Sequence, residues 1–320
     1  GSDAPVSTYR SIANLFVDSI EYDGVYYPEP YCGATILDPQ HILTAAHCIY
    51  GSNALQLFTT VVPQLGDSSD YPSGNIQRVR VSEIYYRNDY SNDISDLLPN
   101  DIAILKLESS LNIDSVNDVI VRPSSESYRA DNVNTSYKAV GHGNTSTGSD
   151  TTTNLLQTDL NLIDNTTCKG YFTEGSKMTD SQICFDGNYS ASTGLNGGTC
   201  QGDSGGPAYW YDGSQYVQVG ITSFGPSTCG YTGGVTSVFT EIYDYRTWID
   251  SVLAGSETPQ RTVTGSDRQT YLDTYGRILL SGSNTLTTND ASGSSGGSLS
   301  FLGLGFLALI GRFRKASVTR

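Results

Sequence analysis

The sequence predicts an all-β fold that is closed by one helix. Two observations predict it: short runs of β-branched, aromatic or alternating residues alternate with clusters of Gly, Pro, Asn, Asp and Ser, and long helical periodicity is nearly absent before Thr240. Short strands separated by frequent turn signals are typical of a β-barrel or β-sandwich. The clearest expected strands are Ala34–Leu37, Ile76–Val81, Ile102–Leu107, Tyr137–Val140, Tyr216–Phe224 and Gly234–Thr240.

The exception to the β pattern is Thr240–Leu253. Apolar side chains recur there at the spacing of one helix face, at Ile242, Tyr245, Ile249 and Val252. We therefore expect a helix at the end of this β-rich region.

The chain of 320 residues is long enough for one large β domain and a tail. Its net charge is −15, and nucleic-acid binding requires a basic face, so we expect no nucleic-acid partner. Seven Lys/Arg and four Asp/Glu lie from Gly255 onward, so the acidic excess belongs to the preceding residues. Such an acidic body is typical of a soluble protein in an extracellular medium.

Six cysteines lie between Cys32 and Cys229. No Cys-x-x-Cys pair or Cys/His cluster suggests a metal, so we expect disulfides, an oxidising compartment, and no metal or cofactor. Acidic loop residues such as Asp67 and Asp70 leave calcium possible, but their spacing is not diagnostic. The sequence begins with neither an initiator Met nor a signal peptide, so we expect it to derive from a longer precursor.

Composition changes after Leu253. Residues 255–298 are rich in Ser, Thr, Gly and Asn and predict a polar linker with little core. Residues 299–320 hold an apolar run, Leu299–Gly311, and a basic end. The run is shorter than the roughly 20 residues of a membrane-spanning helix, so it predicts a marginal anchor with the basic end on the cytoplasmic side.

Three short segments carry residues suited to nucleophilic catalysis. His47 follows an apolar strand, Asp101 precedes another, and Ser204 lies in a glycine-rich turn. A serine hydroxyl needs an adjacent base, an imidazole accepts its proton near neutral pH, and a buried carboxylate fixes the imidazole tautomer. The glycines let the amides of Gly202 and Ser204 converge on one developing oxyanion.

These segments, Thr44–Cys48, Asp101–Leu105 and Gly202–Pro207, resemble the three signature blocks of the chymotrypsin/trypsin family. The resemblance covers residues 1–254, which it identifies as a protease domain. It implies two six-stranded antiparallel β-barrels with the catalytic triad between them, and a serine endopeptidase in which His47, Asp101 and Ser204 have the roles described above.

The resemblance also implies three disulfides and an activation step. The implied pairs are Cys32–Cys48, Cys168–Cys184 and Cys200–Cys229. Relatives are zymogens, and an activating protease frees an Ile-Val-Gly-Gly amino terminus whose ammonium pairs with the Asp before the nucleophile, here Asp203. The sequence starts at Gly1-Ser2 instead, so we expect it to begin a few residues after that cleavage site.

Substrate contacts are implied by the same resemblance. Ser223-Phe224-Gly225 resembles the segment that pairs with the substrate backbone, and Ser223 would also hold the triad carboxylate. Gly198 would form the floor of the specificity pocket, beside Thr199 and with Gly225 and Gly234 on its walls. A neutral, open pocket predicts cleavage after apolar or aromatic residues.

Several alternatives remain open. Elastase-like specificity follows if other residues fill the pocket, and trypsin-like specificity follows if Asp186 reaches it. A non-catalytic binding protein would have lost a triad or oxyanion residue, and none is lost. The remaining histidines, His41 and His142, are interpreted as structural or surface residues.

Gly296-Gly297-Ser298, the apolar run and the basic end resemble a GlyGly-type sorting signal of Gram-negative bacteria. The resemblance implies a secreted or cell-surface bacterial protease whose tail contacts the membrane transiently. The expected partners are protein or peptide substrates and the activating protease, and we expect a monomer.

Overall fold

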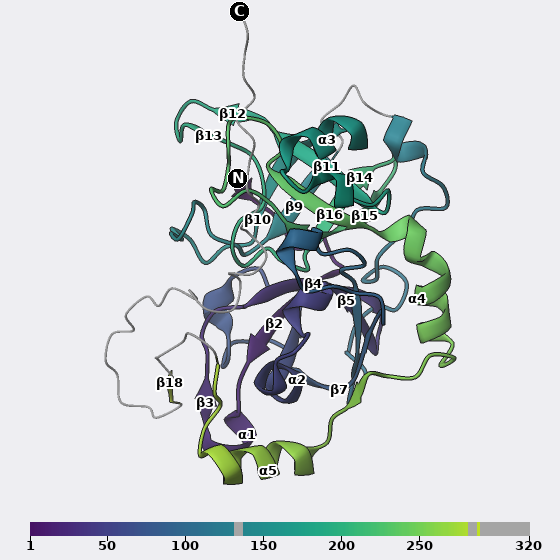
Figure 1. Ribbon diagram of the computed structural model, residues 1–320. Helices are drawn as coiled ribbons and strands as arrows, with labels where there is room; N and C mark the ends of the chain where they lie inside the picture. Colours follow the sequence, from purple (N-terminus) through teal and green to yellow (C-terminus); the bar gives the residue numbers. More distant parts are fainter. Residues whose placement is uncertain (131–136, 281–286, 289–320) are drawn as a thin grey trace, which may run out of the picture.

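Two antiparallel β-barrels contain most of the strands. The computed structural model describes residues 1–130, 137–280 and 287–288 (Figure 1). The first barrel has the strand order β7-β6-β2-β4-β5-β8 and closes by pairing of β7 with β8, while the second has the order β10-β11-β16-β15-β14-β9 and closes by pairing of β10 with β9. The two six-stranded barrels confirm the fold class that the sequence predicts.

The strand bounds are as follows. The first barrel contains β2 (Ile12–Val17), β4 (Cys32–Asp38), β5 (His41–Thr44), β6 (Thr59–Pro63), β7 (Val79–Tyr86) and β8 (Ala103–Leu107). The second contains β9 (Tyr137–Gly141), β10 (Leu156–Ile163), β11 (Gln182–Gly187), β14 (Pro207–Tyr211), β15 (Tyr216–Phe224) and β16 (Ser237–Glu241).

Short strands and helices lie outside the two six-stranded barrels. The short strands are β1 (Ser2–Asp3), β3 (Val25–Tyr26), β12 (Tyr189–Ser190), β13 (Leu195–Asn196), β17 (Arg261–Thr262) and β18 (Thr287–Thr288). The helices are α1 (Ile20–Asp23), α2 (Asn53–Phe58), α3 (Asn165–Tyr171), α4 (Arg246–Leu253) and α5 (Gly265–Tyr275).

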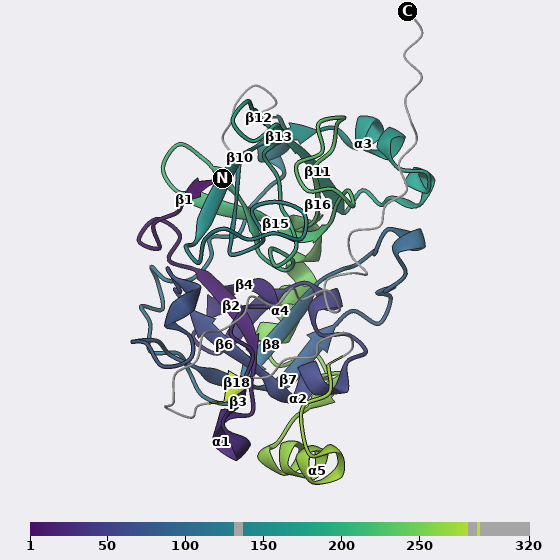
Figure 2. The same ribbon diagram turned by 90° about the vertical axis from the view of Figure 1, so that its left-hand side faces the viewer.

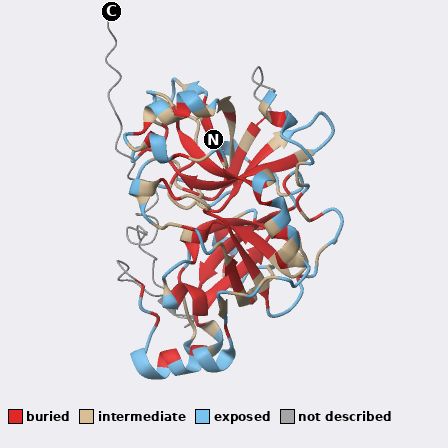
Figure 3. Cartoon of the chain, turned by 45° about the vertical axis from the view of Figure 1, so that its right-hand side comes forward, coloured by how far each residue is buried: buried red, intermediate tan, exposed pale blue. Residues whose placement is uncertain are grey.

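The hydrophobic core fills both barrels (Figure 3). In β2 all six residues are buried, and β15 is buried along eight of its nine positions. Each fully buried aliphatic or aromatic side chain contributes about 1.5–3 kcal/mol. This burial fixes the strand ends, and the candidate site lies on loops at those ends.

The expected strand Tyr216–Phe224 coincides with β15, whereas the expected helix Thr240–Leu253 is shorter in the structure. Thr240 and Glu241 belong to β16, where they pair with β11 and β15, and α4 begins only at Arg246 after a 3₁₀ turn. Tertiary strand pairing overrides the helical periodicity at the first residues of that segment.

The structure differs from the sequence expectation within residues 255–298. Part of the expected polar linker is packed: β17 pairs with β7, and α5 lies at the far end of the first barrel (Figure 2). Tyr271, Ile278 and Leu280 are buried in the core of the first barrel. Val263 and Leu272 are buried as well. Five apolar side chains spread along a polar segment give little periodicity, and this explains why the sequence pattern does not reveal the packing.

The expected anchor segment, residues 299–320, lies outside the described residues. Among the residues that the structure does describe, no helix is long and apolar enough to cross a membrane.

Three disulfides join the pairs that the resemblance implies. They connect Cys32 to Cys48, Cys168 to Cys184 and Cys200 to Cys229, and no cysteine remains free. Each closes a loop whose entropy in the unfolded chain it reduces, which contributes on the order of 2–4 kcal/mol.

Candidate active site

His47 and Asp101 meet between the two barrels. His47 lies in the 3₁₀ turn Ala46–Cys48 after β5, and Asp101 lies just before β8, the strand that pairs with β5. The Nδ1 atom of His47 is 2.7 Å from Oδ2 of Asp101, and the backbone amide of His47 donates to Oδ1 at 2.9 Å. Two contacts to one carboxylate fix both the ring and the turn that carries it.

The second barrel holds Asp101 from the opposite side. Ser223 on β15 donates its hydroxyl to Oδ2 of Asp101 at 2.5 Å, and Thr240 on β16 donates to the Asp101 carbonyl at 2.8 Å. The Asp101 side chain is fully buried. A buried carboxylate with these donors stays positioned to orient an imidazole. The contact of Ser223 agrees with the resemblance, whereas no sequence signal pointed to Thr240.

The turn that carries Ser204 is packed tightly against the first barrel. The amide of Gly33 on β4 donates to the Ser204 carbonyl at 2.7 Å. Gly205 has a φ of +78°, and a side chain there would collide with the Thr44 hydroxyl and the Gly33 carbonyl. Glycine is therefore required at Gly205, because only it allows the Ser204 turn to approach the strand that leads to His47.

The amides of Gly202 and Ser204 are available as donors. Neither donates a hydrogen bond to another group in the described part of the chain, and Gly202 adopts a φ of +98°. Two free amides beside a serine hydroxyl match the requirements of an oxyanion site.

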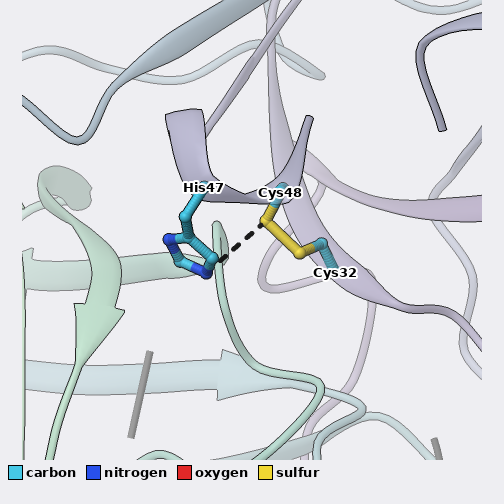
Figure 4. Close-up of side chains that lie close together, drawn as sticks. All are labelled: Cys32, His47 and Cys48. Atoms are coloured by element: carbon cyan, nitrogen blue, oxygen red, sulfur yellow. Dashed lines mark hydrogen bonds between the residues drawn. A yellow bond between two sulfur atoms is a disulfide. The ribbon is translucent and has the colours of Figure 1, made fainter. Parts of the chain in front are cut away.

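The far nitrogen of His47 faces the neighbouring disulfide (Figure 4). Nε2 lies 3.9 Å from Sγ of Cys48, and no hydrogen bond joins it to the Ser204 hydroxyl among the described residues. Such catalytic hydrogen bonds are often formed only with substrate in place. His47, Cys32 and Cys48 lie close enough to suggest metal ligands, but the two sulfurs are bonded to each other and offer no thiolate.

The expected pocket floor is neutral. A Cβ atom added at Gly198 would lie 2.7 Å from the Cβ atom of Thr236. The amide and hydroxyl of Thr199 both donate to the Ser237 hydroxyl at 2.9 Å. Asp186 is engaged by other groups, since its carboxylate accepts from the Gly187 amide and the Asn196 side chain.

The other residues expected to line the pocket have well-defined neighbours. Gly225 lies against the Thr236 carbonyl, and Gly234, with a φ of +142°, lies against the ring of Tyr171. Phe224 is buried and packs edge-on against Phe172 with a centroid distance of 5.6 Å.

Asp203 is buried beside the Ser204 turn. Its carboxylate accepts from the amides of Gly143 and Cys200 at 2.9 Å each, and no salt bridge to it is found among the described residues. Burial raises the pKa of Asp203 to about 6, against the opposing effect of the two amides. A cavity of about 240 Å³ borders Asp203 and also reaches Gly1.

The two other histidines lie away from the His47–Asp101 pair. His41 binds Asp38, with Nδ1 2.8 Å from a carboxylate oxygen. His142 is buried, neither of its ring nitrogens has a hydrogen-bond partner in the part of the chain that the structure describes, and burial lowers its pKa to about 4.

Comparisons with known proteins agree with this geometry. A family model described as Trypsin matches residues 13–249. Chymotrypsin-like elastase family member 1 of Bos taurus is 31% identical over 227 residues, covering 70% of this chain and 79% of that protein. Trypsin zeta of Drosophila melanogaster is 30% identical over 248 residues, covering 74% of this chain and 80% of that protein.

A solved structure shows the same fold. The secreted serine protease VesC from Vibrio cholerae aligns with a TM-score of 0.61 and 21% identity over 78% of this chain. The chain spans about half of that protein, 47% of its length. The solved structure shows the fold, and the family model and the identity to the relatives show that the chain belongs to the trypsin family of serine endopeptidases.

Proposed function

We propose that the chain hydrolyses peptide bonds through an acyl-enzyme, with Ser204 as nucleophile, His47 as base and Asp101 as the group that orients the base. The observation that carries this proposal is the convergence of His47, Ser223 and Thr240 on Asp101 beside the free amides of the Ser204 turn. Residues 1–254 are the proposed protease domain.

The geometry supports a two-step reaction. His47 Nε2 takes the Ser204 proton as the hydroxyl attacks the scissile carbonyl, and the imidazolium then gives that proton to the leaving amine. Asp101 stabilises the imidazolium through Nδ1, 2.7 Å away. The amides of Gly202 and Ser204 bind the oxyanion, and water repeats the sequence on the acyl-enzyme.

The neutral pocket floor supports cleavage after apolar or aromatic residues. The nearest neighbours of a side chain at Gly198 would be the uncharged Thr236 and Ser237, and Asp186 is engaged by Asn196. A guanidinium placed there would be desolvated without a partner. Thr236 beside Gly198 narrows the floor and favours small aliphatic residues as the second candidate.

Asp203 is the proposed partner of an amino-terminal ammonium. Its buried carboxylate, raised pKa and bordering cavity support this role. In relatives an activating protease frees that amino terminus, and its ion pair with the carboxylate orders the oxyanion amides. Zymogen activation is therefore part of the proposal.

Secretion to a bacterial surface is proposed from the disulfides and from the order of residues near the end of the sequence. The three disulfides suit an oxidising compartment, and the Gly-Gly-Ser, apolar and basic order after residue 295 supports a sorting segment that contacts the membrane transiently. The proposed partners are protein substrates, and the proposed active species is a monomer.

A peptide panel tests the proposal. Activated protein is assayed on substrates with Arg/Lys, Phe/Tyr/Leu or Ala/Val before the scissile bond, with Ser204→Ala as the control. We expect cleavage after Phe, Tyr or Leu that the control lacks. Cleavage after Ala or Val supports the narrowed floor, cleavage after Arg or Lys contradicts the neutral pocket, and no cleavage by activated protein supports a non-catalytic binding protein.

A further inference from the structure

A C-terminal segment, residues 260–280, runs along the first barrel and is here called the strap. It lies beyond residues 13–249, the part that matches the family model. The strap begins with β17, which pairs antiparallel with β7, and continues through α5 to Leu280 (Figures 1 and 2). It is therefore an addition to the two-barrel domain.

The strap is anchored by a buried arginine. Arg268 on α5 is almost fully buried and donates to the carbonyls of Leu57 and Val81 at 2.6 and 2.8 Å. Its remaining nitrogen binds Glu108 at 2.6 Å. Leu57 belongs to the last turn of α2, where backbone carbonyls have no partner within the helix. By binding the Leu57 carbonyl, Arg268 caps the C-terminal end of α2.

Apolar contacts reinforce this attachment. The ring of Tyr271 meets the ring of Phe58 on α2 edge-on, with a centroid distance of 5.4 Å. Figure 3 shows that buried positions are confined to one part of α5, while the rest of the helix is exposed. The strap therefore packs against α2 with one face.

A chain of hydrogen bonds leads from the strap to the turn that carries His47. Arg261 donates to the side-chain oxygen of Gln56 at 2.7 Å, and the Gln56 amide nitrogen donates to the Ile49 carbonyl at 3.1 Å. The amide of Ile49 in turn donates to the Ala46 carbonyl at 3.0 Å, within the turn that contains His47.

The buried amide of Gln56 is the central link. Its side chain is satisfied at both ends, by Arg261 on one side and Ile49 on the other. Without the guanidinium its oxygen would be buried without a donor, and a side chain in that state turns to find one. Turning the Gln56 amide releases the Ile49 carbonyl, two residues from His47.

We propose that the strap is a positioning element of the protease, which holds the His47 turn through Arg261 and Gln56. The inference rests on the proposed function of His47 as base. A catalytic imidazole displaced by about 1 Å loses on the order of a hundredfold in rate, so a loosened turn has a measurable effect.

The test compares Arg261→Met with Arg122→Met in the full chain. Arg122 makes an ion pair with Asp250 on α4 at 2.8 Å and serves as the matched control. Active sites are titrated by acylation so that unfolded protein does not count. We expect Arg261→Met to lower kcat by about five- to tenfold with KM within about twofold, Arg261→Lys to restore most of it, and Arg122→Met to change neither.

Gln56→Met is the second variant, because it removes the amide at similar volume and leaves Arg268 in place. We expect the double variant Arg261→Met/Gln56→Met to lose no more kcat than Gln56→Met alone, since both act through one link. Additive losses, or an unchanged kcat per active site in Arg261→Met, overturn the proposal.

A spectroscopic readout separates this inference from the proposed function. The Nδ1 proton of His47 in its 2.7 Å hydrogen bond to Asp101 gives a low-field NMR resonance whether or not the protein turns over substrate. If the activated parent protein hydrolyses no peptide, the proposed function fails. In that case a displaced resonance in Arg261→Met still supports the strap's role, and an unchanged one overturns it.

Discussion

Asp203 and His142 are buried groups whose titrations oppose each other. Gly141 and Gly143, the neighbours of His142, both lie against the Asp203 carboxylate, so the two groups share one region of the second barrel. Burial raises the pKa of Asp203 to about 6, with Asp150 adding to the rise and the amino group of Gly1 opposing it. Burial lowers the pKa of His142 to about 4, against the opposing effects of the Gly66 backbone and of the Asp67 charge.

The signs follow from which state binds more protons. Between pH 4 and 6 folded Asp203 keeps a proton that the unfolded carboxyl group has lost, so its contribution to the free energy of unfolding falls as pH rises. Between pH 4 and 6.5 the unfolded His142 binds a proton that the buried ring does not, so its contribution rises with pH. The pKa differences between the folded and unfolded states, about 2.2 for Asp203 and about 2.5 for His142, each correspond to about 3 kcal/mol. The two contributions therefore largely cancel in the parent protein.

Substituting either Asp203 or His142 should reveal the pH dependence of unfolding that the remaining group contributes. Relative to the parent, Asp203→Asn should gain about 2–3 kcal/mol in the free energy of unfolding between pH 4 and 7, because the cost of the buried charge disappears. His142→Phe should have a higher free energy of unfolding than the parent at pH 4, because the parent then bears the cost of its neutral buried imidazole. That difference should fall by about 3 kcal/mol by pH 7. Taking differences from the parent cancels every other titrating group.

Urea unfolding followed by tryptophan fluorescence, at half-unit steps from pH 4 to 7.5, measures these differences. A Ser204→Ala background removes self-digestion. Asp212→Asn is the control, since Asp212 is exposed and its pKa is lowered by the amides of its turn, which places its titration below the range. The reasoning is refuted if the variant and the parent differ in free energy of unfolding by an amount that changes by less than about 1 kcal/mol from pH 4 to 7.5. A change of the opposite sign refutes it as well.

Three further predictions test the site and its support. Asp101→Asn should lower kcat by about 10⁴-fold, which is the effect of the same exchange in the well-studied serine-protease triad. Burst kinetics on an ester substrate measures kcat, and a loss below tenfold contradicts the role of Asp101 in orienting His47. Gly198→Ala should lower kcat/KM by about tenfold, since the added methyl would lie 2.7 Å from the Cβ of Thr236, and adding Thr236→Gly should restore it in the peptide assay. Replacing both Cys168 and Cys184, 16 residues apart, by Ser should reduce the free energy of unfolding by about 3 kcal/mol, and an unchanged urea midpoint contradicts this.

Local patterns in the sequence were enough to predict the fold class and to point to the candidate catalytic residues. Reactive residues in short, glycine-marked segments are local signals, so the sequence pointed to His47, Asp101 and Ser204, and the family resemblance supplied their expected roles. Alternation and turn residues are also local, which made β15 predictable to its ends. The even cysteine count predicted disulfides, whereas the pairing came from the family resemblance.

How these segments are held together became visible only in the folded chain. The support of Asp101 by Thr240 joins residues 139 positions apart, and the link from Arg261 to Gln56 spans 205 positions. Such contacts depend on which strand ends the two barrels bring together, and no short sequence window contains that information. The strap was expected to be a linker for the same reason: its burial comes from the surface of the first barrel, to which its own polar sequence gives no clue.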